Sequence, residues 1–271
     1  MSYKTREDLQ KRVQEHYDWA VSRGYEVVGV FLQGSWNYSF DLCDEQSDVD
    51  TKCWVLPKLE DIALNKKPLS FTYVMENGEH CDVKDLRLYM DCFRKQNVNF
   101  IEVLFTDFYV INPKYKNVID LLLYNRESIA HYDKKATLNC MLGMAIQKQK
   151  DLCHTYNGNQ ENIIKYGYDG KQLSHVLRMN YMLQAYVLNI SYEKCLNVSN
   201  FAKVLLDIKR YKKVFTKDEA IELMNCTVEG MKNTVNHYLS TKDYNHKNKE
   251  VDKLFEYVSI ECLDKSLRKM F

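Results

Sequence analysis

The stretch VVGVFLQGSWNYSFDLCDEQSDVDTKCWVLP, residues 27–57, decides the fold of this chain. It opens with an apolar, β-branched run at 27–32, which is short enough to predict a buried strand. That run leads to Gly34 and Ser35, where a polar, turn-rich interval begins. A second strand-like run follows at 47–56. The stretch therefore predicts two strands that are separated by a corner of small residues and a polar spacer.

Two carboxylates, Asp48 and Asp50, stand near the start of the second run. Because side chains two apart on a strand face the same way, both would lie on one face, with Cα atoms roughly 6–7 Å apart. Two anions at that separation repel by about 2.5 kcal/mol at an effective dielectric constant of about 20, and a cation between them removes the repulsion. Mg²⁺ suits this position, since it commonly takes one or two carboxylates together with substrate phosphates. Gly34 and Ser35 add a closely approachable backbone and a hydroxyl donor for a phosphate.

The order strand, Gly34-Ser35, spacer, Ser-Asp48-x-Asp50, strand resembles the signature of the DNA polymerase β-like nucleotidyltransferases. The resemblance implies an α+β protein whose N-terminal domain has a small mixed sheet with flanking helices. It also implies that Asp48 and Asp50 are catalytic and bind Mg²⁺ or Mn²⁺, and that Gly34 and Ser35 bind the β- and γ-phosphates of a nucleoside triphosphate (NTP). The implied reaction moves a nucleoside monophosphate (NMP) to a hydroxyl group and releases pyrophosphate.

A third carboxylate is expected from a hairpin that follows, with strands at 71–75 and 80–83 joined through an Asn-Gly turn. Asp82 lies on its second strand, where pairing with the Asp48/Asp50 strand would bring it to the same face. In two-metal phosphoryl transfer, the ion that activates the nucleophile needs such a carboxylate, so we expect Asp82 to be catalytic and a metal ligand. Asp85 is the alternative, but its position favours an N-cap of the next helix.

Two further blocks resemble one family within this superfamily, the RNA repair pathway DNA polymerase β-like nucleotidyltransferases. The first is 82–106, which contains an Asn turn and then an apolar-Glu-x-Leu block. Its Glu102 is of interest, although an ordinary Glu at the edge of an element is the interpretation that we favour. Periodicity leaves open whether 98–106 is a strand or a short helix.

The second block is 166–178, a Gly-Tyr-Asp…Lys…His…Arg pattern. Lys171, His175 and Arg178 fall at positions i, i+4 and i+7 of a predicted helix and share one face. Such a face suits the phosphates of a nucleotide or an RNA backbone, or it is a solvated basic stripe. The family block favours the first interpretation, so we expect all three to bind nucleotide. A basic run at 209–213 is more typical of a solvated loop or helix end than of an RNA contact.

The rest of the chain predicts two domains within its 271 residues. Thr5 is the expected N-cap of a first helix that Gly24 ends. From Pro113 on the pattern is almost wholly helical. Helices are predicted at 114–125, 134–154, 170–190, 199–208, 217–239 and 248–270. We expect a catalytic domain at 1–125 and a helical domain at 126–271 that closes the cleft for nucleotide and acceptor.

Charge divides along the same boundary. Residues 1–125 carry 15 Lys and Arg against 20 Asp and Glu, and residues 126–271 carry 23 against 17. An acidic half beside a basic half suits a metal site that faces a groove for a polyanion; ordinary variation along a chain of net charge +1 is the other interpretation.

Composition excludes several classes of protein. No apolar run approaches the ~20 residues of a membrane span, and the polar N-terminus is not a secretory signal. Nine cysteines without a Cys-x-x-Cys pair indicate neither zinc nor redox chemistry and favour reduced thiols in a cytoplasmic protein.

The sequence therefore predicts a nucleotidyltransferase, with RNA as the acceptor that the family resemblance implies. Two alternatives use the same scaffold. One is a non-catalytic sensor or interaction protein that binds nucleotide or RNA, which three intact carboxylates argue against. The other is an enzyme that modifies a small molecule, such as an antibiotic.

Overall fold

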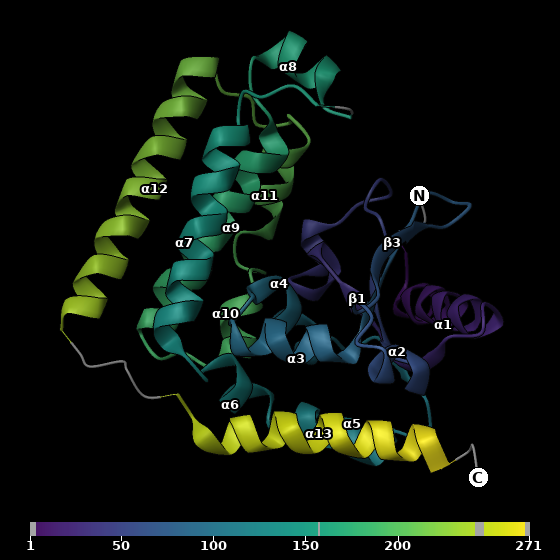
Figure 1. Ribbon diagram of the computed structural model, residues 1–271. Helices are drawn as coiled ribbons and strands as arrows, with labels where there is room; N and C mark the ends of the chain where they lie inside the picture. Colours follow the sequence, from purple (N-terminus) through teal and green to yellow (C-terminus); the bar gives the residue numbers. More distant parts are fainter. Residues whose placement is uncertain (1–3, 157, 242–246, 269–271) are drawn as a thin grey trace. The chain divides into compact units, whose positions relative to one another are not determined.

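The computed structural model describes residues 4–156, 158–241 and 247–268 of the chain (Figure 1). Its contacts divide the chain into two compact units. Unit 1 comprises Met1–Asn37, Asp44–Asp133 and Lys247–Phe271, and unit 2 comprises Tyr38–Cys43 and Lys134–His246.

Unit 1 contains a five-stranded mixed sheet in the order β3-β4-β2-β1-β5. The strands are β1 (Glu26–Gln33), β2 (Asp50–Leu56), β3 (Ser70–Val74), β4 (His80–Asp85) and β5 (Tyr109–Ile111). Strands β2 and β4 run parallel, and every other neighbouring pair is antiparallel. A mixed sheet with flanking helices confirms the predicted α+β class, and it sets two strands of the 27–57 stretch and the second hairpin strand side by side.

Helix α1 (Arg6–Ser22) covers one face of this sheet (Figure 1). Thr5 caps it as predicted, in a capping box with Asp8. The buried stripe of the helix includes His16, whose Nδ1 lies 2.7 Å from Thr51 Oγ1 on β2. Since side chains alternate along a strand, Thr51 marks this face and its neighbours Asp50 and Lys52 mark the other.

Aromatic side chains cover that other face. They come from α3 (Leu86–Arg94) and α4 (Val98–Ile101). The Trp54 ring lies 4.8 Å from the Tyr89 ring and 5.8 Å from the Phe93 ring, between centroids. Asp85 caps α3 by accepting the Arg87 N–H at 2.9 Å, which agrees with the N-cap interpretation.

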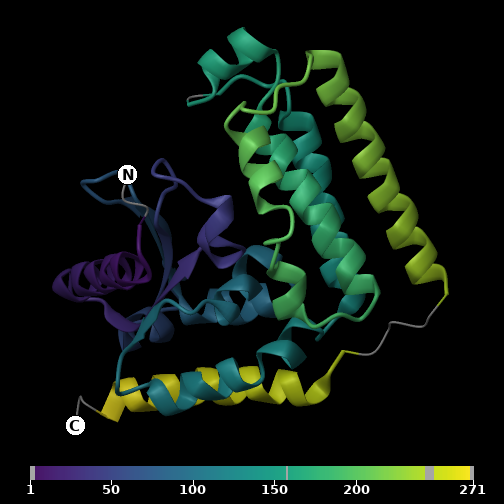
Figure 2. The same ribbon diagram turned by 180° about the vertical axis from the view of Figure 1, so that it is seen from behind.

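The last described helix, α13 (Lys249–Leu267), also belongs to unit 1, where it lies beside α5 (Lys116–Tyr124) in both views (Figures 1 and 2). Phe255 stacks on Phe93 of α3 with ring centroids 5.9 Å apart. Tyr132, which follows α6 (Arg126–Ala130), donates its hydroxyl to Asp252 at 2.8 Å. The contacts of α13 thus differ from the prediction, which placed all of 126–271 in one helical domain.

Unit 2 is all-helical in its described residues and is built around α9 (Gly170–Val187), which contacts α7 (Lys134–Asp151), α12 (Lys217–Ser240), α11 (Ala202–Lys209) and α10 (Tyr192–Leu196). Helix α8 (Gln160–Tyr166) precedes α9 in the chain. The segment Tyr38–Cys43, with its 3₁₀ turn Phe40–Leu42, packs on α11, and Tyr38 accepts the Val198 N–H at 3.1 Å. Part of the polar spacer of the 27–57 stretch therefore belongs to unit 2.

The structure decides several short elements. Residues 98–105, whose state the sequence left open, are helical, as α4 and the 3₁₀ helix Glu102–Phe105. Short elements such as α6, α8, α10 and β5 were not predicted, because brief segments have too few residues to show a period. A short helix, α2 (Leu59–Ala63), lies in the connection between β2 and β3. The predicted end of the last helix near 270 lies outside the described residues. No helix in the described part of the chain is both long and apolar enough to cross a membrane.

Candidate functional site

The corner after β1 is held by a buried carboxylate. Gly34 has φ +89°, a conformation that favours glycine, and the 3₁₀ turn Ser35–Asn37 starts directly after it. The Gly34 N–H donates to Glu102 Oε1 at 3.0 Å. Glu102 is only 4% exposed. Because this acceptor is buried, its hydrogen bond to Gly34 fixes one side of the corner that was predicted to bind phosphate.

A tryptophan connects this corner to the first carboxylate. Trp36 is buried, and its Nε1–H donates to the backbone carbonyl of Asp48 at 2.9 Å. Asn37 donates its side-chain amide to the carbonyl of Leu32 at 2.9 Å. The Trp36 hydrogen bond thereby ties the Asp48 backbone to the turn that begins at Ser35, within unit 1 and across the spacer.

The two predicted carboxylates of β2 are accessible. Asp48 is exposed just before the strand, and Asp50 is its first residue, with a side chain 33% exposed. Asp50 Oδ1 accepts two hydrogen bonds from His80, one from its backbone N–H and one involving its ring Nδ1, each at 3.1 Å. His80 opens β4 and lies beside Asp50 in the parallel pair.

Asp82 is in a different environment. It pairs with Lys52 in the β2–β4 register, and its carboxylate accepts from Lys52 Nζ at 3.2 Å and from Lys84 Nζ at 2.6 Å. Its side chain is 14% exposed and that of Lys52 only 5%. Burial acts to raise the pKa of Asp82, but the hydrogen bonds and positive charges of Lys84 and Lys52 outweigh it and lower that pKa.

The pKa of Lys52 is lowered, because burial outweighs the attraction of Asp82. The Lys52 ammonium lies 4.2 Å from the centroid of the Phe100 ring, a cation–π contact. Asp82 is therefore neutralised by side chains of the protein, and a metal ligand at this position would have to exchange both lysines.

These environments decide how well the residues fit a divalent cation. Across the described ranges, no group of three or more His, Cys, Asp and Glu side chains is placed to hold a metal ion. Asp48 and Asp50 fit an ion such as Mg²⁺, which needs only one or two carboxylates when phosphates supply further oxygens. Asp82 shares the face of Asp50 on the sheet but does not fit in its present pairing. The site of three carboxylates stays a prediction.

The predicted nucleotide-binding residues of α9 belong to unit 2 and differ in accessibility. Lys171 is exposed. His175 is half-buried, and burial together with the nearby charge of Arg178 holds its pKa well below the usual range, so it is neutral near pH 7. Arg178 is 7% exposed and its guanidinium lies 3.7 Å from the centroid of the Tyr38 ring. Lys171 is thus the member of this triad that can meet a phosphate without rearrangement.

The neighbouring residues of the same block have structural roles. Asp169 caps α9 by accepting the Lys171 N–H at 2.8 Å. The Gly170 N–H donates to Tyr211 Oη at 2.8 Å, and a Cβ at Gly170 would lie 2.5 Å from the carbonyl of Ile208. Tyr211 belongs to the basic run 209–213, in which α11 ends at Lys209, as expected of a helix end.

Comparisons with known proteins add a distant structural similarity. No protein-family model matches the chain, and no curated protein sequence matches it. Among solved structures, the fold is similar to that of a nucleotidyltransferase-like protein from Exiguobacterium sibiricum, with 12% identity, a TM-score of 0.31, and coverage of 85% of this chain and 78% of that one. A similarity this distant assigns no role to any residue.

Sequence reasoning missed three residues of the site. Glu102 was set aside as an ordinary edge residue, although a carboxylate inside the run NFIEVLF signals a buried partner. Trp36 was given no role, because its place in the polar spacer does not reveal that its indole reaches the Asp48 carbonyl. His80 was left without a role, because its position opposite Asp50 depends on which strand β4 pairs with and in what register.

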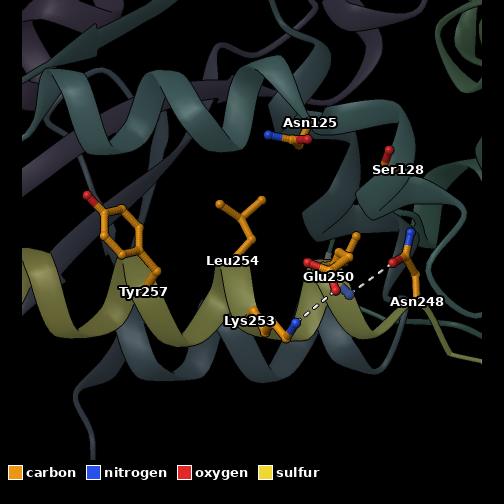
Figure 3. A pocket seen from close by; sticks show the side chains of 8 residues that line it. Asn125, Ser128, Asn248, Glu250, Lys253, Leu254 and Tyr257 are labelled. Carbon is orange, nitrogen blue, oxygen red and sulfur yellow. Dashed lines mark hydrogen bonds and ion pairs between the residues drawn. The ribbon is translucent and has the colours of Figure 1, made fainter.

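A pocket elsewhere in unit 1 contains none of these residues. It lies along α13, facing Asn125 and Ser128 (Figure 3). Lys253 donates to Glu250 at 2.9 Å, and the Glu250 N–H donates to Asn248 at 3.1 Å. Glu250 is the single carboxylate among the described residues that line it, so the pocket lacks the pair of carboxylates found at the start of β2.

Proposed function

We propose that this chain is a metal-dependent nucleotidyltransferase that moves an NMP from an NTP to a hydroxyl acceptor and releases pyrophosphate. One observation carries the proposal. The hydrogen bond from Trp36 to the Asp48 carbonyl joins the Gly34-Ser35 corner to the accessible carboxylates of β2. An anion-binding turn beside a pair of carboxylates is the combination that a metal–triphosphate complex needs.

Each residue has a defined task in this proposal. Gly34 and Ser35 form the phosphate-binding corner: the Gly34 N–H already donates to Glu102, so Gly34 shapes the turn, and Ser35 binds the β- and γ-phosphates through its backbone N–H and its hydroxyl. Asp48 and Asp50 hold Mg²⁺ or Mn²⁺, which when bound neutralises the charge that develops on the phosphates. The chain itself orients the triphosphate and the acceptor, which is most of what phosphoryl transfer requires of a protein.

Asp82 and the residues of α9 have roles that depend on their present contacts. Asp82 completes a second cation site only if Lys52 and Lys84 release it. Lys171 supplies an exposed positive charge to the phosphates of the nucleotide or of an RNA acceptor. His175 supplies a neutral hydrogen-bonding group, and Arg178 contributes only if it leaves Tyr38. RNA is the acceptor that the resemblance to the RNA repair family favours.

The test is incubation with each α-labelled NTP, Mg²⁺ or Mn²⁺, and total RNA, protein or metabolites as acceptors. We expect label to enter the RNA fraction with release of pyrophosphate. Asp50→Asn should lower the rate by orders of magnitude, whereas Asp91→Asn, the same change at an exposed aspartate of α3, should leave it unchanged. Unchanged turnover in a folded Asp50→Asn protein would reject the assignment. Label in the metabolite fraction would identify a small-molecule acceptor instead.

The pairing of Asp82 with two lysines favours a second candidate, a nucleotide-binding protein without catalysis. Such a protein would bind NTP and release no pyrophosphate with any acceptor. Equilibrium binding measured beside pyrophosphate release therefore separates the two functions.

A further inference from the structure

We propose that His80, together with Asp50, binds the divalent cation at the start of β2, in the place expected for Asp82. The proposal rests on the proposed function for the nucleotide that supplies the remaining ligands. It adds an imidazole to the carboxylates of the proposed site. Asp50 and His80, from adjacent parallel strands, already form a pair, and Asp48 is exposed just before β2.

The register of β2 and β4 brings His80, and not Asp82, beside Asp50. Strands β2 and β4 are parallel, with Thr51 opposite Cys81 and Lys52 opposite Asp82. His80 and Asp50 each come one residue earlier, so they meet at the edge where both strands begin. Asp82 lies two residues further along, roughly 6–7 Å from that edge at the rise of a strand. The residue that reaches the cation position from β4 is therefore His80.

The separation of the two side chains already suits a shared ion. His80 Nδ1 and Asp50 Oδ1 are 3.1 Å apart. Neighbouring ligands of an octahedral ion with bonds of about 2.1 Å stand about 3 Å from each other. A cation could thus replace the hydrogen bond between the His80 imidazole and the Asp50 carboxylate with little movement, while the His80 backbone N–H keeps Asp50 in place.

Side-chain exposure also favours His80 over Asp82 as the ligand of the cation. The His80 side chain is 46% exposed and that of Asp50 33%, so an ion and a triphosphate can reach both. Asp82 is largely covered and is neutralised by Lys52 and Lys84. Bringing a cation to Asp82 means displacing two ammonium groups, whereas bringing it to His80 displaces one hydrogen bond.

Two protein ligands are too few for tight binding without substrate. This agrees with the finding that the described residues contain no preformed group of three metal-binding side chains. We therefore expect cation binding to require the nucleotide. An imidazole ligand also favours transition-metal ions, so the complex should bind Mn²⁺ or Co²⁺ more tightly than Mg²⁺.

The experiment is pulsed electron paramagnetic resonance of Mn²⁺ bound to the full chain, in which only the histidines are labelled with ¹⁵N. The nucleotide is an ATP analogue with a methylene group between the α- and β-phosphorus atoms. The expected result is a ¹⁵N hyperfine coupling to the ion. His80→Gln should abolish the coupling and weaken Mn²⁺ binding on the order of 10–100-fold. His237→Gln, at an exposed histidine of α12, should change neither.

Three results would overturn the proposal. They are Mn²⁺ bound without a ¹⁵N coupling, no Mn²⁺ binding even with the nucleotide analogue, and a loss of binding in Asp82→Asn that His80→Gln does not show. A missing coupling in the labelled natural sequence overturns the proposal even where a variant fails to fold. A coupling to His80 in a chain that transfers no NMP would reject the proposed function and retain the ligand, and transfer without the coupling would do the reverse.

Discussion

The hydrogen bond between Gly34 and Glu102 provides the sharpest test of how the phosphate-binding corner is built. Glu102→Met and Glu102→Gln both remove the negative charge and keep a side chain of similar length. Only Gln keeps an oxygen that can accept the Gly34 N–H, which now lies 3.0 Å from Glu102 Oε1. The difference between the two variants therefore isolates the acceptor from the charge.

The burial of Glu102 sets the size of the expected loss in stability. Glu102 is 4% exposed, so water does not readily replace the lost acceptor. An unsatisfied donor in such a place costs about 1–3 kcal/mol, and we expect Met to be less stable than Gln by that amount. For a chain of this size the difference lowers the melting temperature by roughly 2–4 °C per kcal/mol.

The assay is urea unfolding followed by tryptophan fluorescence, to which Trp36 contributes beside the corner, together with NTP binding to the folded variants. Because the Gly34–Glu102 hydrogen bond holds the corner on which Ser35 would meet the phosphates, we expect Met also to bind NTP more weakly than Gln. Glu76→Met, at an exposed turn, is the control and should match the natural sequence in both measurements. Equal stability and equal affinity of the Met and Gln variants would refute the role of Glu102.

Three further predictions concern charge and packing. Asp82→Asn leaves the buried Lys52 without its partner and should lower the free energy of unfolding by about 3–5 kcal/mol near pH 7. Because the folded-state pKa of Asp82 is lowered, its contribution is fully present above the unfolded-state pKa of about 4 and is lost as pH falls through the lower folded-state value. The difference in stability between the variant and the natural sequence should therefore begin to narrow below about pH 4 and close only below the folded-state pKa; a constant difference in acid would contradict this. Gly170→Ala places a Cβ 2.5 Å from the Ile208 carbonyl and should destabilise unit 2 by about 1–3 kcal/mol in urea unfolding. A variant that unfolds at the same urea concentration as the natural sequence would contradict this. Lys171→Ala should weaken NTP binding roughly tenfold by equilibrium titration without changing stability, and an unchanged affinity would leave this residue a solvated cation.

Local chemistry made much of unit 1 predictable. The N-caps at Thr5 and Asp85 depend on contacts within three residues, so their sequence signals survive in the fold. The helical state of 98–105 was not decided, because a short apolar run satisfies a strand and a buried helix equally well. What distinguishes them is the contact of Phe100 with Lys52 and Tyr89, which are distant in the chain.

The position of α13 was not predictable either, because it depends on contacts with residues far away in the chain. Its apolar positions predicted a helix, and a helix is present at 249–267. The stripe that contains Phe255 could have packed on any apolar surface, and it packs on Phe93 in unit 1. A hydrophobic stripe specifies that a face is buried, not which face covers it.

The sequence by itself determined the two strands of the 27–57 stretch, the glycine corner between them, and the presence of Asp48 and Asp50 at the start of the second strand. These depend on residue period and on conformations that a few neighbouring residues impose. Only the tertiary structure decided that Glu102 holds the corner, that His80 meets Asp50, and that Asp82 pairs with lysines. Each of these depends on strand register or on contact between segments far apart in the chain, and a shift of one residue would exchange every side chain from one face of the sheet to the other.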